Sequence, residues 1–404
     1  MNGIFAIEKP SGITSSQFLA KLQRVLTNSV VFSTEIQRAT SERMKMYQQQ
    51  TGRKASKRKL RKVSKVKMGH GGTLDPLASG VLVIGVGSGT KKLSQYLSGT
   101  VKVYESEALF GVSTTSGDVE GEILTTNSVK HLTMTELKTV EQKFVGALKQ
   151  TPPIYAALKM NGKPLHEYAR EGIPLPRAIE PRQVTIYALD IYPDSLSVDH
   201  DYKLLRPSTE EAIETVKKLD TNINDDVLYY SKEYCEKHGL KSEEAEIEPP
   251  IPLTNEESKE ITEKGDEYRA PLLHFKATVS SGTYIRSLIS DIGKAMRSSS
   301  YMVKLIRTQQ QEWSLERNNV FSMEDFTEQD ERVWTRVLEK VLEKGSEVNI
   351  KEELLKAQQE FEAEAMEQEK KAQSDAAEQD QMIQEAKEDA TSSSVKRTIE
   401  DVEK

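Results

Sequence analysis

The residue whose surroundings suit it best to chemistry is Asp75. It lies in residues 69–80 (GHGGTLDPLASG), where glycines and one proline surround a single carboxylate. Glycine adopts backbone conformations closed to other residues, while Pro76 fixes its own φ and restricts Asp75 toward an extended conformation. A carboxylate held in such a loop can serve as a nucleophile or a base. The loop alone also allows Asp75 to be a simple turn residue, because Asp and Pro are both common in turns.

This loop is one of four colinear motifs that resemble the TruB family of pseudouridine synthases. The other three are KPSGITS at residues 9–15, KVY at residues 102–104 and SGTYIR at residues 281–286. The similarity covers residues 1–330 with two interruptions, and the eukaryotic tRNA pseudouridine-55 synthases are the branch it resembles most. The resemblance implies an isomerase that converts a uridine in the T-loop of tRNA to pseudouridine.

That reaction breaks the bond between N1 and C1′, rotates the uracil and rejoins it to the sugar through C5. The resemblance makes Asp75 the nucleophile, which either adds to the sugar or base or removes a ribose proton on the way to a glycal. The sequence leaves both routes open. No cofactor is expected, and a metal site is not predicted, because the six histidines contain no His-x-x-x-His pair and only one cysteine accompanies them.

Two further residues are expected at the reacting centre by the same resemblance. Arg286 corresponds to the arginine that pairs with the carboxylate and favours its charged form. Tyr104 corresponds to the tyrosine that stacks on the extruded uracil, and a role for its hydroxyl as a base stays open. Without the resemblance, Arg286 would be interpreted as a structural ion pair and Tyr104 as a core aromatic residue.

The resemblance also implies a set of substrate contacts. Residues 151–176 correspond to a thumb loop that closes on RNA, and their interleaved aromatic and basic residues suit stacking and phosphate contact, although a plain surface loop is the alternative. Tyr284 and Leu305 should form the walls of the uracil pocket, and His70 should insert near the extruded base. Lys9 should position phosphate or support the loop. Asp118, Lys159 and Arg170 should contact RNA.

The hydrophobic pattern predicts elements that would hold these residues. A helix should follow the first motif, because Phe18, Leu22, Val25 and Leu26 recur at helical spacing. The family resemblance implies an α+β (mixed α/β) pseudouridine synthase fold with a central, mostly antiparallel sheet flanked by helices. Strands are predicted at 81–86, 101–112 and 272–279, helices at 133–148 and 286–296, and an apolar stretch at 301–308.

Charge is distributed unevenly along the 404 residues, whose net charge is -7. We predict a catalytic domain over residues 1–330, with a basic insertion at about 30–67 and an acidic, partly disordered insertion at about 204–268. Residues 331–404 should form an acidic tail that passes from helix to disorder. Within residues 51–67 stand nine Lys or Arg and no acidic residue, a pattern typical of phosphate binding or nuclear import.

The expected partner is the T-arm of tRNA, together with other RNAs that carry T-loop-like stems, bound in a salt-sensitive manner. A guide RNA is not expected, because the acidic tail argues against the guide-dependent branch of the family, and a monomer is predicted. No run is apolar enough for a membrane, so we predict an intracellular protein of the nucleus, with mitochondrial import left open. The alternative function is an RNA-binding protein or tRNA folding chaperone with secondary catalysis.

Overall fold

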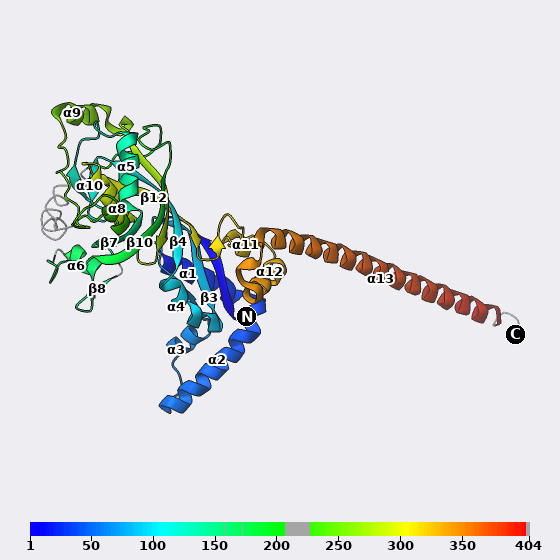
Figure 1. Cartoon of the computed structure of the whole chain (residues 1–404). Helices are drawn as coiled ribbons and strands as arrows, with labels where there is room; N and C mark the ends of the chain where they lie inside the picture. The colour runs from blue at the N-terminus through cyan, green and yellow to red at the C-terminus, as the bar shows by residue number, and fades with distance from the viewer. Residues whose placement is uncertain (157, 172, 207–226, 401–404) are drawn as a thin grey trace.

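A nine-stranded mixed sheet forms the centre of the protein (Figure 1). The computed structural model describes residues 1–156, 158–171, 173–206 and 227–400. The strand order is β1-β3-β12-β4-β11-β10-β7, with β2 added to β3 and β13 to β12, and every pair is antiparallel except β3 with β12. The expected mixed α/β fold with a mostly antiparallel sheet is therefore confirmed. The strands are β1 (Gly3–Lys9), β2 (Met68–His70), β3 (Ser79–Val86), β4 (Val101–Phe110), β7 (Gly146–Gln150), β10 (Arg182–Ile191), β11 (Leu272–Ser280), β12 (Ser300–Gln310) and β13 (Trp313–Ser314).

Two large hydrophobic clusters cover different parts of this sheet. One packs β1 and β3 against α1 (Ser15–Asn28), α11 (Glu324–Thr327) and α12 (Glu331–Lys344). The other packs one face of β4, β11 and β10 against α5 (Met134–Phe144) and α10 (Ile285–Ala295). Because side chains alternate across a strand, residues between those of the second cluster face the opposite side of the sheet. That side is partly polar, and a third, smaller cluster that includes Leu109, Leu272 and Tyr301 covers the rest of it.

The local sequence explains where the first helices begin and end. Thr14 caps α1 through a capping box with Gln17, and Phe18, Leu22 and Leu26 are buried along one face, as predicted. The helix predicted at 133–148 stops earlier than expected. It ends at Phe144 because Gly146 adopts a φ of 125° and starts β7.

The acidic insertion is more ordered than its composition suggested. Residues 207–226 lie outside the described residues, but the remainder contains α8 (Lys232–Lys237), α9 (Asn255–Lys264) and a 3-10 turn, η2 (Gly265–Glu267). Leu228, Tyr230 and Cys235 are buried in the second cluster. Residues 227–268 of the predicted, partly disordered loop are therefore ordered, because a few buried apolar residues among the acidic ones anchor the segment.

The predicted division at residue 331 does not follow the packing. Trp334, Leu338 and Val341 of α12 are buried in the first cluster, together with Ile350 and Leu354 at the start of α13 (Ile350–Glu400). The composition averaged over the whole tail hides these residues. Beyond them α13 projects from the body as a long helix, and its described side chains are mostly exposed.

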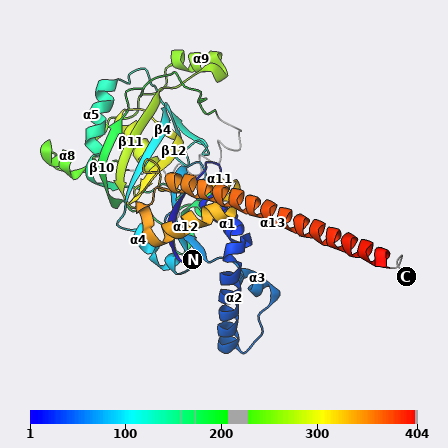
Figure 2. The same cartoon turned by 90° about the vertical axis from the view of Figure 1, so that its right-hand side faces the viewer.

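The basic insertion forms a helical arm, defined here as α2 (Val30–Thr51) and α3 (Lys57–Val63) with their connection. Figures 1 and 2 show α2 leaving the body in a direction different from α13, with α3 returning beside it. Shorter elements complete the described chain, none of whose helices is long and apolar enough to cross a membrane. They are η1 (Gly87–Lys92), α4 (Ser94–Leu97), β5 (Val112–Thr114), β6 (Ile123–Thr126), β8 (Lys159–Met160), β9 (Lys163–Pro164), α6 (Leu165–Glu171) and η3 (Gly345–Glu347).

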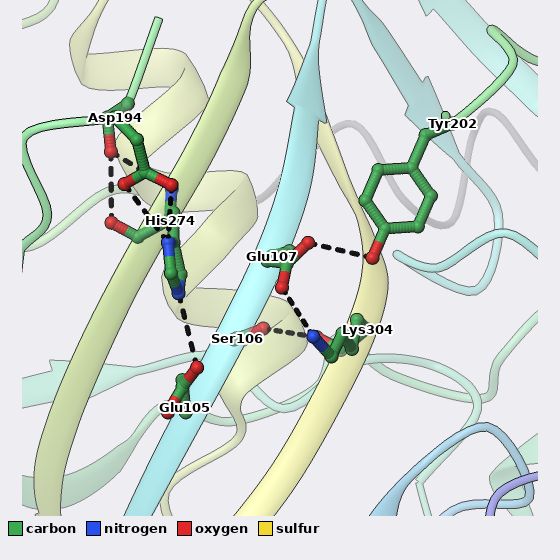
Figure 3. A network of polar contacts seen from close by, with 8 residues as sticks. Glu105, Ser106, Glu107, Asp194, Tyr202, His274 and Lys304 are labelled. Atoms are coloured by element: carbon green, nitrogen blue, oxygen red, sulfur yellow. Dashed lines mark hydrogen bonds and ion pairs between the residues drawn. The ribbon is translucent and has the colours of Figure 1, made fainter. Parts of the chain in front are cut away.

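The polar face of the sheet carries a cross-strand network, which Figure 3 shows in close-up. Glu107 of β4 accepts from Lys304 Nζ at 2.6 Å and from the Tyr202 hydroxyl at 2.7 Å. The imidazole of His274 lies between Asp194, at 2.9 Å, and Glu105, at 3.3 Å. These contacts join β4, β11 and β12 on the side of the sheet opposite to Tyr104.

Glu107 should make the stability of this face depend on pH. Burial would raise the pKa of its carboxyl, but the hydrogen bonds from Lys304 and Tyr202 outweigh burial and lower the pKa below the ordinary 4.5. A lowered pKa stabilises the fold above that ordinary value, and the stabilisation is lost as pH falls through the folded-state pKa. We expect Glu107→Gln to lower the free energy of unfolding by about 1 kcal/mol at pH 7 and by less in acid. Urea unfolding at both pH values checks this, with the exposed Glu339→Gln as the control; equal losses at both pH values would contradict it.

Candidate active site

The loop that carries Asp75 connects β2 to β3 and is held by the N-terminal motif at residues 9–15. The Ser15 hydroxyl accepts from the Leu74 N–H at 2.9 Å and lies 3.0 Å from the Leu74 carbonyl, to which it can donate. The Ser11 hydroxyl donates to the Leu77 carbonyl at 2.6 Å, and the Gly12 N–H donates to the Pro76 carbonyl at 2.8 Å. The two motifs are thus adjacent in space, and the first fixes the backbone on both sides of Asp75.

Lys9 lies beneath this loop and is fully buried. Its Nζ donates to the carbonyls of Ile13 at 2.6 Å, Pro10 at 2.8 Å and Pro76 at 3.4 Å. Burial lowers the pKa of its ammonium to about 8, while the nearby Asp75 carboxylate acts in the opposite direction. Of the two roles expected for Lys9, this arrangement suits support of the loop, because the enclosed ammonium already faces three carbonyls.

Arg286 and Asp75 form the ion pair that the sequence predicted. Arg286 Nε lies 3.0 Å from Asp75 Oδ2, and the guanidinium also donates to the carbonyls of Ser116 at 2.7 Å and Tyr155 at 3.0 Å. The arginine side chain is 5% exposed, whereas that of Asp75 is 37% exposed. The guanidinium is therefore fixed by several acceptors, and the carboxylate it holds remains accessible.

Asp118 supports this arrangement from inside the protein. Its carboxylate lies 3.9 Å from Arg286 Nε and accepts from the Ser116 hydroxyl at 2.5 Å and from the Glu120 N–H at 3.0 Å. Burial raises the pKa of Asp118, and the Ser116 hydrogen bond and Arg286 oppose that rise. The expected contact with RNA is not supported, because Asp118 is 4% exposed and its oxygens face protein donors.

Tyr104 and Leu305 line the same apolar region beside the loop. Both are buried, and they share one cluster with Leu74 and Ala78 of the loop and with Ile285 of α10. They come from neighbouring strands: Tyr104 lies on β4, and Leu305 is paired with Ser106, two residues further along that strand. The two predicted pocket residues thus face the same side of the sheet.

Tyr284 stands at the N-terminal end of α10 and is half-buried. Gln150 of β7 fixes its backbone on both sides: the Tyr284 N–H donates to Gln150 Oε1 at 2.8 Å, and Gln150 Nε2 donates to the Tyr284 carbonyl at 3.1 Å. Burial raises the pKa of the Tyr284 hydroxyl. The turn before Arg286 is therefore held by a residue that the sequence reasoning missed.

The remaining predicted contacts lie further from the ion pair or are less fully described. His70 ends β2 and is half-buried, and burial lowers the pKa of its imidazole. Lys159 is exposed on β8, and Arg170 belongs to α6 with a side chain outside the described part of the chain. The thumb, residues 151–176, packs on small apolar clusters of its own and touches the site through the Tyr155 carbonyl.

Ser15, Ser116 and Gln150 complete the site but could not be predicted. Each acts through a hydrogen bond between a polar group and the backbone of a distant segment, and no spacing in the sequence marks such a pair. Arg307 is easier to notice in the sequence than these three residues, because it is a charged residue within a largely apolar strand. Among the described residues, no group of three or more His, Cys, Asp or Glu side chains could hold a metal ion.

An accessible carboxylate paired with a buried guanidinium, next to a tyrosine on a mixed sheet, is the arrangement expected for a pseudouridine synthase. A family model described as "TruB family pseudouridylate synthase (N terminal domain)" matches residues 57–210. The chain is 75% identical to tRNA pseudouridine synthase 4 of Saccharomyces cerevisiae over 367 residues, which is 91% of each chain. It is 35% identical to tRNA pseudouridine synthase 4 of Schizosaccharomyces pombe over 351 residues, 80% of this chain and 82% of that one.

Bacterial relatives match a shorter part. The chain is 35% identical over 192 residues to tRNA pseudouridine synthase B of Geobacillus thermodenitrificans, which covers 47% of this chain and 50% of the relative. The identities of 75% and 35% over most of the two yeast proteins establish the family. The protein belongs to the TruB family of pseudouridine synthases.

Proposed function

We propose that this protein isomerises uridine-55 in the T-loop of tRNA to pseudouridine, with Asp75 as the nucleophile. The ion pair between Asp75 and Arg286 is the observation that carries the proposal, because it presents one ionised carboxylate beside the apolar walls formed by Tyr104 and Leu305. The similarity to the yeast proteins named tRNA pseudouridine synthase 4 supports tRNA as the substrate.

The reaction follows from these positions. The uridine leaves its stack at a cost of about a few kcal/mol, and its base lies against Tyr104. Asp75 then either adds to the nucleotide or removes a ribose proton, and the bond between C1′ and N1 breaks. The uracil turns and C5 bonds to C1′, while Asp75 either leaves the nucleotide or returns the ribose proton. The proton on C5 then leaves and N1 gains a proton, so no atom is lost overall and Asp75 is regenerated. In this proposal Arg286 orients the carboxylate in both routes.

The substrate is expected to be recognised through the T-arm, by the thumb on one side and the helical arm on the other. Exposed Arg and Lys residues line the tip and the returning segment of the arm, including Lys54, Lys57, Arg58 and Arg61. The proposed substrate range also includes other RNAs that carry T-loop-like stems. We also propose that the protein acts as a monomer, which is compatible with an ion pair and apolar walls built from residues of a single chain.

The arm should contribute affinity without contributing to the chemical step. In the double variant Lys57→Ala/Arg58→Ala we expect KM for tRNA to rise about five- to tenfold at low salt, with kcat unchanged, because two phosphate contacts are lost. The slope of log affinity against log salt should become shallower by about 1.5. The matched control is Lys370→Ala/Lys371→Ala, an adjacent pair on the exposed part of α13. Equal KM changes in both variants would show that the arm has no specific role.

The proposed function is tested with tRNA transcripts that carry tritium at C5 of uracil. Release of tritium from the full-length transcript, absent when uridine-55 is replaced by cytidine, is the expected result. Tight binding and refolding of tRNA without any tritium release would favour the alternative, an RNA chaperone. Release that is unaffected by the replacement would show isomerisation at another position.

A further inference from the structure

The strand β12 contains an irregularity where it passes beneath the active-site loop. Its register with β4 pairs Arg307 with Tyr104 and Gln310 with Lys102, with an extra residue accommodated between them. Side chains alternate along a regular strand, so residues three apart would face opposite sides. The bulge shifts the alternation by one residue. Arg307 and Gln310 therefore both face the side of the sheet that carries Tyr104.

Arg307 bridges the two ends of the loop. It is completely buried, its Nε donates to the Val81 carbonyl at 2.7 Å and its Nη2 lies 3.4 Å from the Gly72 carbonyl. Gly72 precedes Asp75 and Val81 follows it. The backbone of Arg307 also fits closely against Gly80, where a Cβ atom would lie 2.3 Å from the Arg307 carbonyl oxygen.

Gln310 holds the neighbouring carbonyl. Its Nε2 donates to the carbonyl of Gly71 at 2.5 Å and to that of Tyr96 at 3.1 Å, and the residue is completely buried. Gly72 has a φ of 124°, a conformation that residues with a side chain rarely adopt. The two side chains of β12 therefore bind consecutive carbonyls at the point where the loop backbone is most unusual.

This arrangement is a poor choice for stability alone. Arg307 Nη1 and Gln310 Oε1 are buried and have no hydrogen-bond partner in the described part of the chain. A buried polar group without a partner is costly, and apolar side chains of similar size often replace buried charges without loss of stability. Arg307 also brings a further positive charge close to Lys9 and Lys102, which the protein must tolerate.

We propose that Arg307 and Gln310 are positioning residues for isomerisation. Their hydrogen bonds to the carbonyls of Gly71, Gly72 and Val81 fix the position and orientation of Asp75. The proposal rests on the role of Asp75 in the proposed function. Neither side chain touches the substrate. Both act through the loop, so their loss should slow the chemical step and leave tRNA affinity unchanged.

The test uses the full-length protein with two conservative variants. Arg307→Lys keeps the positive charge but loses the planar guanidinium that reaches two carbonyls at once. Gln310→Met keeps the length of the side chain but loses its N–H donors. We expect the single-turnover rate with saturating tRNA to fall about ten- to a hundredfold in each, since a misplacement of about 1 Å can cost that much. Dissociation constants should stay within twofold of wild type. Phe326→Leu, in the cluster around β1, is the control for destabilisation alone.

A second readout separates this proposal from the proposed function. Amide hydrogen exchange in the absence of RNA should be faster at residues 71–78 in both β12 variants and unchanged there in Phe326→Leu, because Leu74 and Ala78 belong to the second cluster and Phe326 to the first. If wild type releases no tritium, the proposed function fails. Faster exchange in the two β12 variants would still show that Arg307 and Gln310 hold the loop in place. Unchanged exchange in the two variants, or single-turnover rates reduced no more than in the control, would overturn the positioning role.

Discussion

Asp75→Asn is expected to remove isomerisation, with kcat at least about 10⁴-fold below wild type. Asparagine keeps the shape of the side chain, and its carbonyl can still accept from Arg286, but a neutral amide can neither add to the nucleotide nor remove a ribose proton. Because the Asp75 side chain is 37% exposed and the loop is held by backbone contacts, the variant should fold. Affinity for tRNA should be within a fewfold of wild type.

Tritium release under single-turnover conditions measures this effect, together with the dissociation constant from filter binding. Asp75→Ala serves as a second variant, since alanine cannot revert by deamidation. Asp190→Asn on β10 makes the same chemical change at an exposed position and should leave the rate unchanged. Turnover near the wild-type rate in both Asp75 variants would assign the chemistry to another carboxylate.

Arg286→Gln should give the second largest loss, about 10²- to 10³-fold in kcat, by analogy with the removal of one preorganised donor. The change removes the cation that faces both Asp75 and the buried Asp118. It also removes the Arg286 hydrogen bonds to the carbonyls of Ser116 and Tyr155. A buried carboxylate that loses its partner destabilises a protein by about 3 kcal/mol, so the free energy of unfolding should fall as well.

Arg286→Lys separates the two consequences. Lysine restores a positive charge, which should recover most of the stability, but a single ammonium cannot reach the carboxylate and both carbonyls together. The expected pattern is near-normal urea unfolding with kcat still reduced about ten- to a hundredfold. A lysine variant with wild-type kcat would show that charge alone suffices, and a glutamine variant with wild-type kcat would contradict any catalytic role for Arg286.

The sequence predicted the parts of the site that depend on residue type. The motifs around Asp75, Tyr104 and Arg286 predicted side chains that the structure brings together, and hydrophobic spacing located α1, β3 and α10. What it missed are contacts between side chains and distant backbone, such as those of Ser15 and Gln150. Their partners are carbonyl and amide groups that every residue carries, so no pattern in the sequence distinguishes them.

Two segments differ from the sequence-based expectations for physical reasons of the same kind. Asp118 lies in a turn rich in glycine and acidic residues, which resembles a solvated loop, yet the turn folds inward and the carboxylate faces Ser116 and Arg286. The acidic insertion has a composition typical of disorder, yet Leu228 and Tyr230 reach the core beside α5. In both segments, burial of a few residues outweighs the average composition.

The carbonyl of Tyr155 connects the thumb to the ion pair between Asp75 and Arg286. One guanidinium donates to this carbonyl and to Asp75, so the first residues of the thumb cannot shift without altering the group that orients the carboxylate. Under the proposed function, an RNA contact that displaced Tyr155 would therefore also displace Arg286, which faces the Asp75 carboxylate. The thumb and the ion pair are thus mechanically coupled through one guanidinium.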